Sequence, residues 1–88
     1  APSALVPHLN SVLAPLLALA RRMDSVPLRT KALQNLQQMT LLPYQSVFPY
    51  RAQVLAALAK CLDDPKRVVR REAVLARNQW YTLSATQP

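Results

Sequence analysis

The sequence predicts an all-α protein, and three observations lead to that prediction. First, the 88 residues contain no glycine, although the tight turns of β-hairpins depend on the positive backbone angles that glycine permits. Second, hydrophobic residues make up 51% of the chain and recur at steps of three and four, the spacing of one helix face. Third, several of the 8 prolines lie where a helix would begin, a position that tolerates their missing N–H.

The first predicted helix covers about residues 5–23. Its apolar residues recur every three or four positions: Leu5, Leu9, Val12, Leu13, Leu16, Leu17, Ala20 and Met23. Pro7 lies in the first turn, where proline is tolerated, whereas Pro15 removes a backbone hydrogen bond inside the helix. We therefore expect a bend near Ser11, one turn before the second proline.

The second helix is predicted over about residues 27–40. Pro27 suits the first helical position, with Ser25 or Val26 just before it. The residues that would face the core share one stripe, and they are Leu28, Ala32, Leu33, Leu36 and Met39.

Two further helices are predicted in the second half of the chain. The third covers about residues 47–62 and the fourth about residues 65–84. Asp64 can cap the free N–H groups of the fourth helix, and Pro65 can open it. The tail, residues 85–88, is expected to fray.

The four helices form two similar units, residues 1–42 and 43–84. Leu28-Arg29-x-x-Ala32-Leu33 in the first unit aligns with Val69-Arg70-x-x-Ala73-Val74 in the second. An antiparallel helix pair repeated at about 40 residues is typical of the HEAT and armadillo (ARM) superhelix, an α-solenoid. An ordinary four-helix bundle is the alternative.

An aspartate precedes the second helix of each unit and is expected to reach an arginine. The expected partners are Asp24 with Arg29 and Asp63 with Arg70. The aspartate could instead reach an arginine of the neighbouring repeat. Solenoid repeats bury a continuous core by stacking, and about three are needed for stability. We therefore expect the two units to be a terminal fragment of a longer solenoid.

The chain is strongly basic, with a net charge of +7. Five basic residues fall on an arc of about 140° around the fourth helix, and they are Lys66, Arg67, Arg70, Arg71 and Arg77. Because second helices line the concave binding face of HEAT solenoids, we interpret this arc as a candidate protein-docking surface. A solvated helix face without a partner and a surface for nucleic acid phosphates are the alternatives.

Aromatic residues close the fourth helix. Trp80 and Tyr81 are candidate partner-binding anchors, since aromatic side chains are favoured at interface hot spots. The alternative for Trp80 is that it covers the end of the core.

The sequence predicts no catalytic, metal or cofactor site, and hence not an enzyme. Cys61 is the one cysteine, which excludes an internal disulfide and zinc-finger spacing; we expect a packed or half-exposed thiol. His8 has no evident nucleophile partner. The longest apolar run, residues 12–20, is about half of a membrane span.

Several motifs of the second unit stand together in a fixed order. They are Pro49-Tyr50-Arg51, Leu58-Ala59-Lys60, Leu62-Asp63-Asp64, Val68-Val69-Arg70-Arg71-Glu72-Ala73-Val74 and Trp80. In this order they resemble the C-terminal HEAT-repeat region of the Mms-nineteen protein family, closely over residues 42–80 and more loosely over residues 5–42. The chain departs from the family pattern at Cys61, where the family has proline, and at Tyr81, where it has phenylalanine.

The resemblance implies an adaptor of the cytosolic iron–sulfur cluster assembly (CIA) targeting complex. The family's C-terminal repeats dock onto a small DUF-fifty-nine-type CIA factor, which binds a WD-repeat propeller subunit. The complex delivers iron–sulfur clusters to client proteins of DNA replication and repair, such as helicases. The resemblance also implies a cytoplasmic and nuclear protein that holds no cofactor and binds no membrane. From the residues alone, a basic helical module that binds nucleic acid phosphates is the alternative function.

Overall fold

A computed structural model describes residues 9–83, with Asn10 described by its backbone alone. Within this range the chain is helical and contains no strand, so the all-α prediction is confirmed. The elements are α1 (Leu9–Leu19), α2 (Val26–Met39), the short α3 (Tyr44–Val47), the 3₁₀ helix η2 (Phe48–Tyr50), α4 (Arg51–Cys61) and α5 (Arg67–Tyr81).

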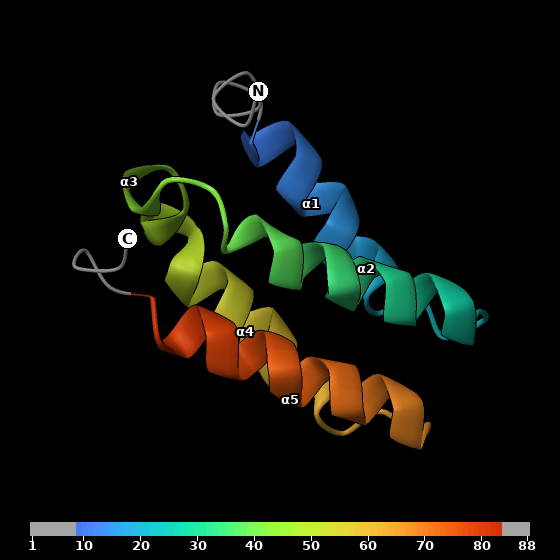
Figure 1. Cartoon of the computed structure of the whole chain (residues 1–88). Helices are drawn as coiled ribbons and strands as arrows, with labels where there is room; N and C mark the ends of the chain where they lie inside the picture. Colours follow the sequence, from blue (N-terminus) through green and yellow to red (C-terminus); the bar gives the residue numbers. More distant parts are fainter. Residues whose placement is uncertain (1–8, 84–88) are drawn as a thin grey trace.

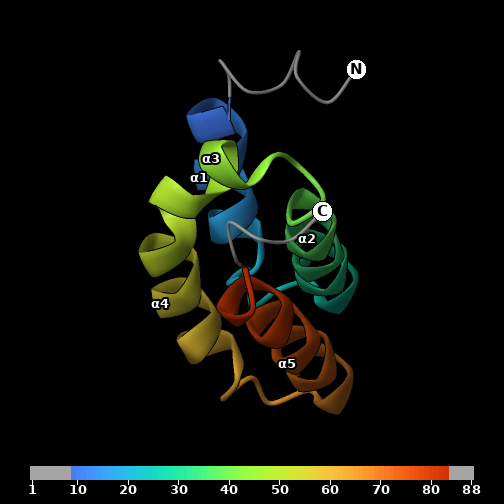
Figure 2. The same ribbon diagram turned by 60° about the vertical axis from the view of Figure 1, so that its left-hand side comes forward.

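The four longer helices form two antiparallel pairs that stack as a fragment of an α-solenoid (Figure 1). The pairs are α1 with α2 and α4 with α5. In Figure 2, α1 and α4 lie in one layer and α2 and α5 in the other. The stacking is unequal, because α5 packs against both α2 and α4. The two pairs are therefore joined mainly through α2 and α5.

The core lies between the two layers and follows the apolar stripes of the sequence. Its members are buried by at least nine-tenths, and they include Leu9, Leu13, Leu33, Leu36, Val54, Leu58, Val69, Ala73 and Ala76. Trp80 is fully buried among them. Its indole Nε1 donates a hydrogen bond of 2.8 Å to the backbone oxygen of Leu36. A side chain of the second pair is thereby bonded to the backbone of the first.

The helix ends of the first pair differ modestly from the prediction. α1 ends at Leu19, four residues before the predicted end, and a turn follows. Ser25 is the N-cap of α2, and its Oγ accepts a hydrogen bond of 3.3 Å from the backbone N–H of Leu28. Pro15 lies inside α1. The bend expected near Ser11 stays a prediction.

The start of the third helix was predicted wrongly as continuous from residue 47. The chain instead forms α3, then η2, and only then α4. Pro49 explains the interruption, because it lacks the N–H that an α-helix would use there. Tyr44 and Phe48 stack across this segment, with ring centroids 4.9 Å apart.

The predicted cap of the fourth helix was also wrong. α5 begins at Arg67, and Lys66 occupies the N-cap position without a side-chain cap. Asp64 lies further back, where its Oδ1 accepts a hydrogen bond of 2.9 Å from the N–H of Lys66. Predictions for residues 5–8, including His8, and for residues 84–88 lie outside the described range. The division of the chain into units at residue 42 stays a prediction.

Candidate protein-docking surface

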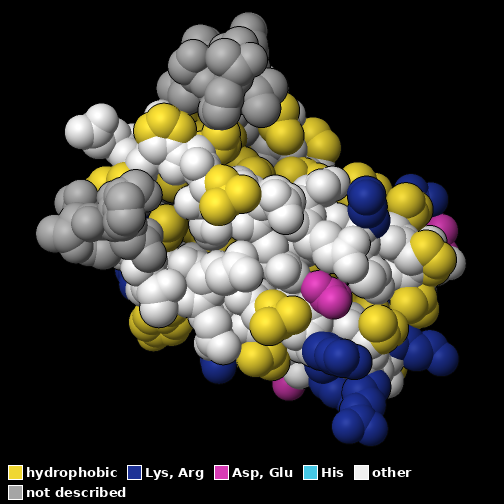
Figure 3. Space-filling model, viewed as in Figure 1, with side chains coloured by type: hydrophobic (Ala, Val, Ile, Leu, Met, Phe, Trp, Pro, Cys, Tyr) yellow, Lys and Arg dark blue, Asp and Glu magenta, His cyan; other side chains and the backbone are white. Residues whose placement is uncertain are grey.

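Four of the five predicted basic residues gather at the start of α5. In Figure 3, Lys and Arg side chains cluster at the lower right, where Figure 1 draws the first turns of α5. Lys66, Arg67 and Arg71 are exposed to solvent and Arg70 is half-buried. We call Lys66, Arg67, Arg70 and Arg71 the basic cluster.

In the part of the chain that the structure describes, no carboxylate forms an ion pair with the basic cluster. Among the residues that the structure describes, the ion pairs are Arg22 with Asp24 and Arg29 with Asp64. The side chain of Glu72 accepts a hydrogen bond of 2.8 Å from Nε2 of Gln37. Lys66, Arg67 and Arg71 therefore present positive charge to solvent.

Arg70 contributes a hydrogen bond to the fold as well as a positive charge. Its Nη1 donates a hydrogen bond of 2.7 Å to the backbone oxygen of Asp64, in the turn before α5. This contact joins α5 to the turn that carries Lys66. Arg70 is therefore less free to meet a partner than its exposed neighbours.

Arg77 and the aromatic residues do not join the basic cluster. Arg77 lies on the same arc but about 9 Å further along the helix axis, and it is half-buried. Trp80 is fully buried, so the alternative reading, that it covers the end of the core, is the one the structure supports. Tyr81 is 61% exposed, but it lies about 21 Å from the start of the helix.

Arg51, which the sequence analysis did not single out, closes the far end of α5. Its Nε and Nη2 donate hydrogen bonds of 3.1 Å to the backbone oxygens of Trp80 and Tyr81. Its guanidinium carbon lies 5.3 Å from the centroid of the Tyr81 ring. Cations are favoured beside the unpaired carbonyls of a helix C-terminus. Tyr81 is thus held by a neighbouring helix.

A buried ion pair connects the two helix pairs beneath the basic cluster. Nε of Arg29 lies 2.6 Å from Oδ2 of Asp64, and Nη2 donates to Oδ1 at 3.1 Å. The two side chains are only 2% and 4% exposed. Nη1 of Arg29 also donates to the backbone oxygen of Arg22 at 2.8 Å. The expected pairs of Asp24 with Arg29 and of Asp63 with Arg70 were therefore wrong.

The environment of Asp64 favours its charged form. Burial raises the pKa of this carboxyl, but the hydrogen bonds from Arg29 and Lys66 and the charges of Arg29 and Arg70 outweigh burial and hold the pKa below its ordinary value. The repeated Asp and Arg register in the sequence was the available signal for this contact. It indicated the residue types and allowed an arginine of the neighbouring repeat, but both of the pairs that it named lie within one unit.

The remaining candidate groups form no reactive site in the described residues. Cys61 is buried, with its Sγ 3.6 Å from the backbone oxygen of Ala20. Burial raises the pKa of its thiol, which makes the reactive thiolate scarcer. Over residues 9–83, no group of three or more His, Cys, Asp and Glu side chains could hold a metal ion. No helix in that range combines the length and apolarity that a membrane crossing requires.

Comparison with known proteins gives a consistent set of relatives. No family model matches the chain. The chain is 41% identical over 85 residues to the "MMS19 nucleotide excision repair protein homolog" of Homo sapiens, which covers 97% of the chain. The homologue of Dictyostelium discoideum is 37% identical over 93% of the chain, and the Drosophila melanogaster protein is 45% identical over 73% of it. The chain spans only 7% to 8% of the length of these relatives.

Proposed function

The chain belongs to the MMS19 family as a homologue of a small part of those proteins, and on this premise we propose that it is a protein-docking module. The relatives are named as nucleotide excision repair proteins. We accordingly assign the module to an adaptor that serves DNA repair, and we assign it no catalytic role.

The observation that carries this proposal is the basic cluster at the start of α5, which forms no ion pair in the described residues. Its charges stand on a helix that two neighbouring helices support, above the buried pair of Arg29 and Asp64. A set of like charges at one end of a supported helix is suited to a partner surface of opposite charge, because it steers the encounter and fixes the orientation of the complex.

We propose that the partner is the DUF-fifty-nine-type CIA factor, joined in turn by the WD-repeat propeller. In this proposal the adaptor helps to deliver iron–sulfur clusters to apo-proteins of DNA replication and repair in the cytoplasm and nucleus. The clusters are cargo and are not held by this module. The support is the order of motifs from Pro49 to Trp80, together with the naming of the relatives.

Binding of nucleic acid phosphates is the second candidate, and the net charge of +7 favours it. Single-stranded nucleic acid is normally held by basic grooves with aromatic side chains on which bases stack. Here Trp80 is buried and Tyr81 lies at the opposite end of α5 from the basic cluster. The surface therefore supports protein docking better.

The test is a pull-down of the purified CIA factor and propeller by the immobilised chain. Replacing Arg67 and Arg71 by glutamine removes two charges at exposed positions and spares the Arg70 bond. We expect capture to fall about tenfold, on the scale of rim charges in interfaces. The matched control is Gln45→Glu with Gln79→Glu, which lowers the net charge equally at exposed positions outside the cluster.

Two outcomes would contradict the proposal. Equal capture by the Arg67→Gln/Arg71→Gln variant and by the control would remove the basic cluster from the contact. Retention of DNA or RNA with a steep salt dependence, without capture of the protein factor, would establish the second candidate instead.

A further inference from the structure

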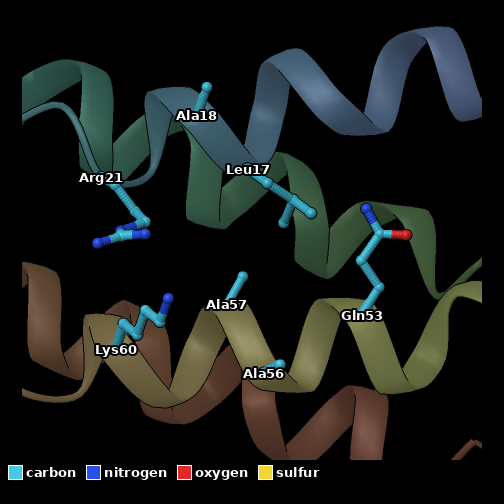
Figure 4. Close-up of a pocket in the computed structure, with 7 residues that line it drawn as sticks. All are labelled: Leu17, Ala18, Arg21, Gln53, Ala56, Ala57 and Lys60. Atoms are coloured by element: carbon cyan, nitrogen blue, oxygen red, sulfur yellow. The ribbon is translucent and has the colours of Figure 1, made fainter.

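A groove separates α1 from α4 in the layer that does not contain α5. Its volume is about 340 Å³. Figure 4 shows Leu17 of α1 and Ala57 of α4 directed toward each other across it. Gln53 stands at one end, and Arg21 and Lys60 face each other at the other end.

The groove follows from the small side chains along its walls. Ala18, Ala56 and Ala57 line it, and alanine leaves space where larger residues would interlock. The two helix pairs are joined through α2 and α5, so α1 and α4 can remain apart without loss of that contact. The apolar walls are accordingly open to solvent.

Two positive charges at one end give the groove a preference for anions. Neither Arg21 nor Lys60 forms an ion pair within the described part of the chain. Both residues are exposed, and their like charges repel across the groove. A carboxylate placed between them would remove that repulsion and form charge-assisted hydrogen bonds.

We propose that this groove binds an extended acidic peptide segment of a partner protein, in which aliphatic residues are followed by aspartate or glutamate. The aliphatic side chain would contact Leu17 and Ala57, and the carboxylate would lie between Arg21 and Lys60. The volume is at the lower end of the range for ligand pockets, about 300–1,000 Å³, which suits one or two side chains.

Gln53 favours a peptide over a fatty acid. Its amide offers both a donor and an acceptor, which match the N–H and carbonyl groups of a peptide backbone. The groove and the basic cluster belong to different layers, so both can be occupied at once. The module would then connect two protein chains.

The test uses the 88-residue chain and a fluorescein-labelled peptide in which two leucines precede three aspartates, flanked by glycine and serine. We expect saturable binding by fluorescence anisotropy at low salt. Amide NMR signals of residues 17–21 and 53–60 should move on titration. Replacing the aspartates of the peptide by asparagine should weaken binding about tenfold.

Two variants locate the site. Ala57→Trp should abolish binding by filling the groove, and Lys60→Glu should weaken it about tenfold by reversing one charge. Circular dichroism checks that each variant is folded. If Ala57→Trp does not fold, Lys60→Glu still tests the site, because Lys60 is exposed. The control Gln45→Glu with Gln79→Glu carries the same net charge as Lys60→Glu and should bind normally.

Absence of saturable binding would overturn the inference, as would binding that Lys60→Glu leaves unchanged. Shifts of the groove signals by dodecanoate but not by the peptide would replace the peptide with a lipid. If peptide binding is lost in Arg67→Gln/Arg71→Gln but not in Lys60→Glu, the peptide occupies the basic cluster and not the groove. Intact peptide binding in that variant, with lost capture of the CIA factor, would support both sites separately.

Discussion

Replacement of Asp64 by asparagine should strongly destabilise the protein. Asparagine keeps the size of the side chain and can still accept the hydrogen bond from the N–H of Lys66. It removes the negative charge that faces Arg29, whose side chain is only 2% exposed. The guanidinium would then be a buried charge without a counter-ion, and burial of such a charge is costly.

The magnitude follows from the burial of both partners. Breaking a buried ion pair by removing one partner costs about 3–5 kcal/mol. A chain of 88 residues has a total stability of about 4–13 kcal/mol at typical values per residue. The variant should therefore lose a large fraction of its free energy of unfolding. In urea, with a slope of about 1–1.5 kcal/mol/M for a chain this small, the midpoint should fall by at least about 2 M.

The assay is urea unfolding followed by far-UV circular dichroism. Asp63→Asn is the matched control, because Asp63 is the adjacent aspartate and is exposed; its effect should stay within about 0.5 kcal/mol. Removing both charges, as Arg29→Met with Asp64→Leu, should cost less than Asp64→Asn alone. A loss below about 1 kcal/mol in Asp64→Asn would refute the reasoning, since it would mean that Arg29 reaches solvent.

Two further predictions follow from the same contacts. Trp80→Phe should lower the free energy of unfolding by about 1–3 kcal/mol, because it leaves the buried oxygen of Leu36 without its donor; urea unfolding by circular dichroism measures this, and an effect equal to that of the exposed control Tyr81→Phe would contradict it. The pKa of Asp64 lies below its ordinary value of 3.8 in the folded state, so its contribution is present above about pH 4 and is lost as the pH falls through the lowered pKa. The free energy of unfolding of the native protein, measured as the pH is lowered, should show this loss. The same dependence on pH in Asp64→Asn would exclude Asp64 as its source.

The fold was largely predictable because its signals are local. Apolar residues at steps of three and four located the four longer helices, and the two similar units indicated the stacked pairs. The ends were less predictable. Pro49 lies near the predicted start of the third helix, and it divides the segment into α3, η2 and α4. The position of Asp64 before Pro65 predicts a helix cap, whereas tertiary contact with Arg29 determines its role.

The candidate site was predictable only in part. The helical wheel placed the basic residues on one arc, but it carries no information on distance along the axis or on burial. The burial of Trp80 therefore appears only in the structure. The groove between α1 and α4 could not be found from the sequence, because it depends on how far apart two helices from different pairs lie.

The unequal spacing of the two layers has a mechanical consequence. Because α2 and α5 are in contact, the helix pairs can rotate about that contact as about a pivot. Rotation that brings α1 toward α4 compresses the open groove until the contact between Cys61 and the backbone of Ala20 resists, whereas the opposite rotation compresses side chains that are already close-packed, and close-packed interiors resist compression. We expect the two helix pairs to bend easily toward the groove and to resist bending in the opposite direction. Filling the groove would prevent the easy bending and fix the curvature of any solenoid that contains this segment.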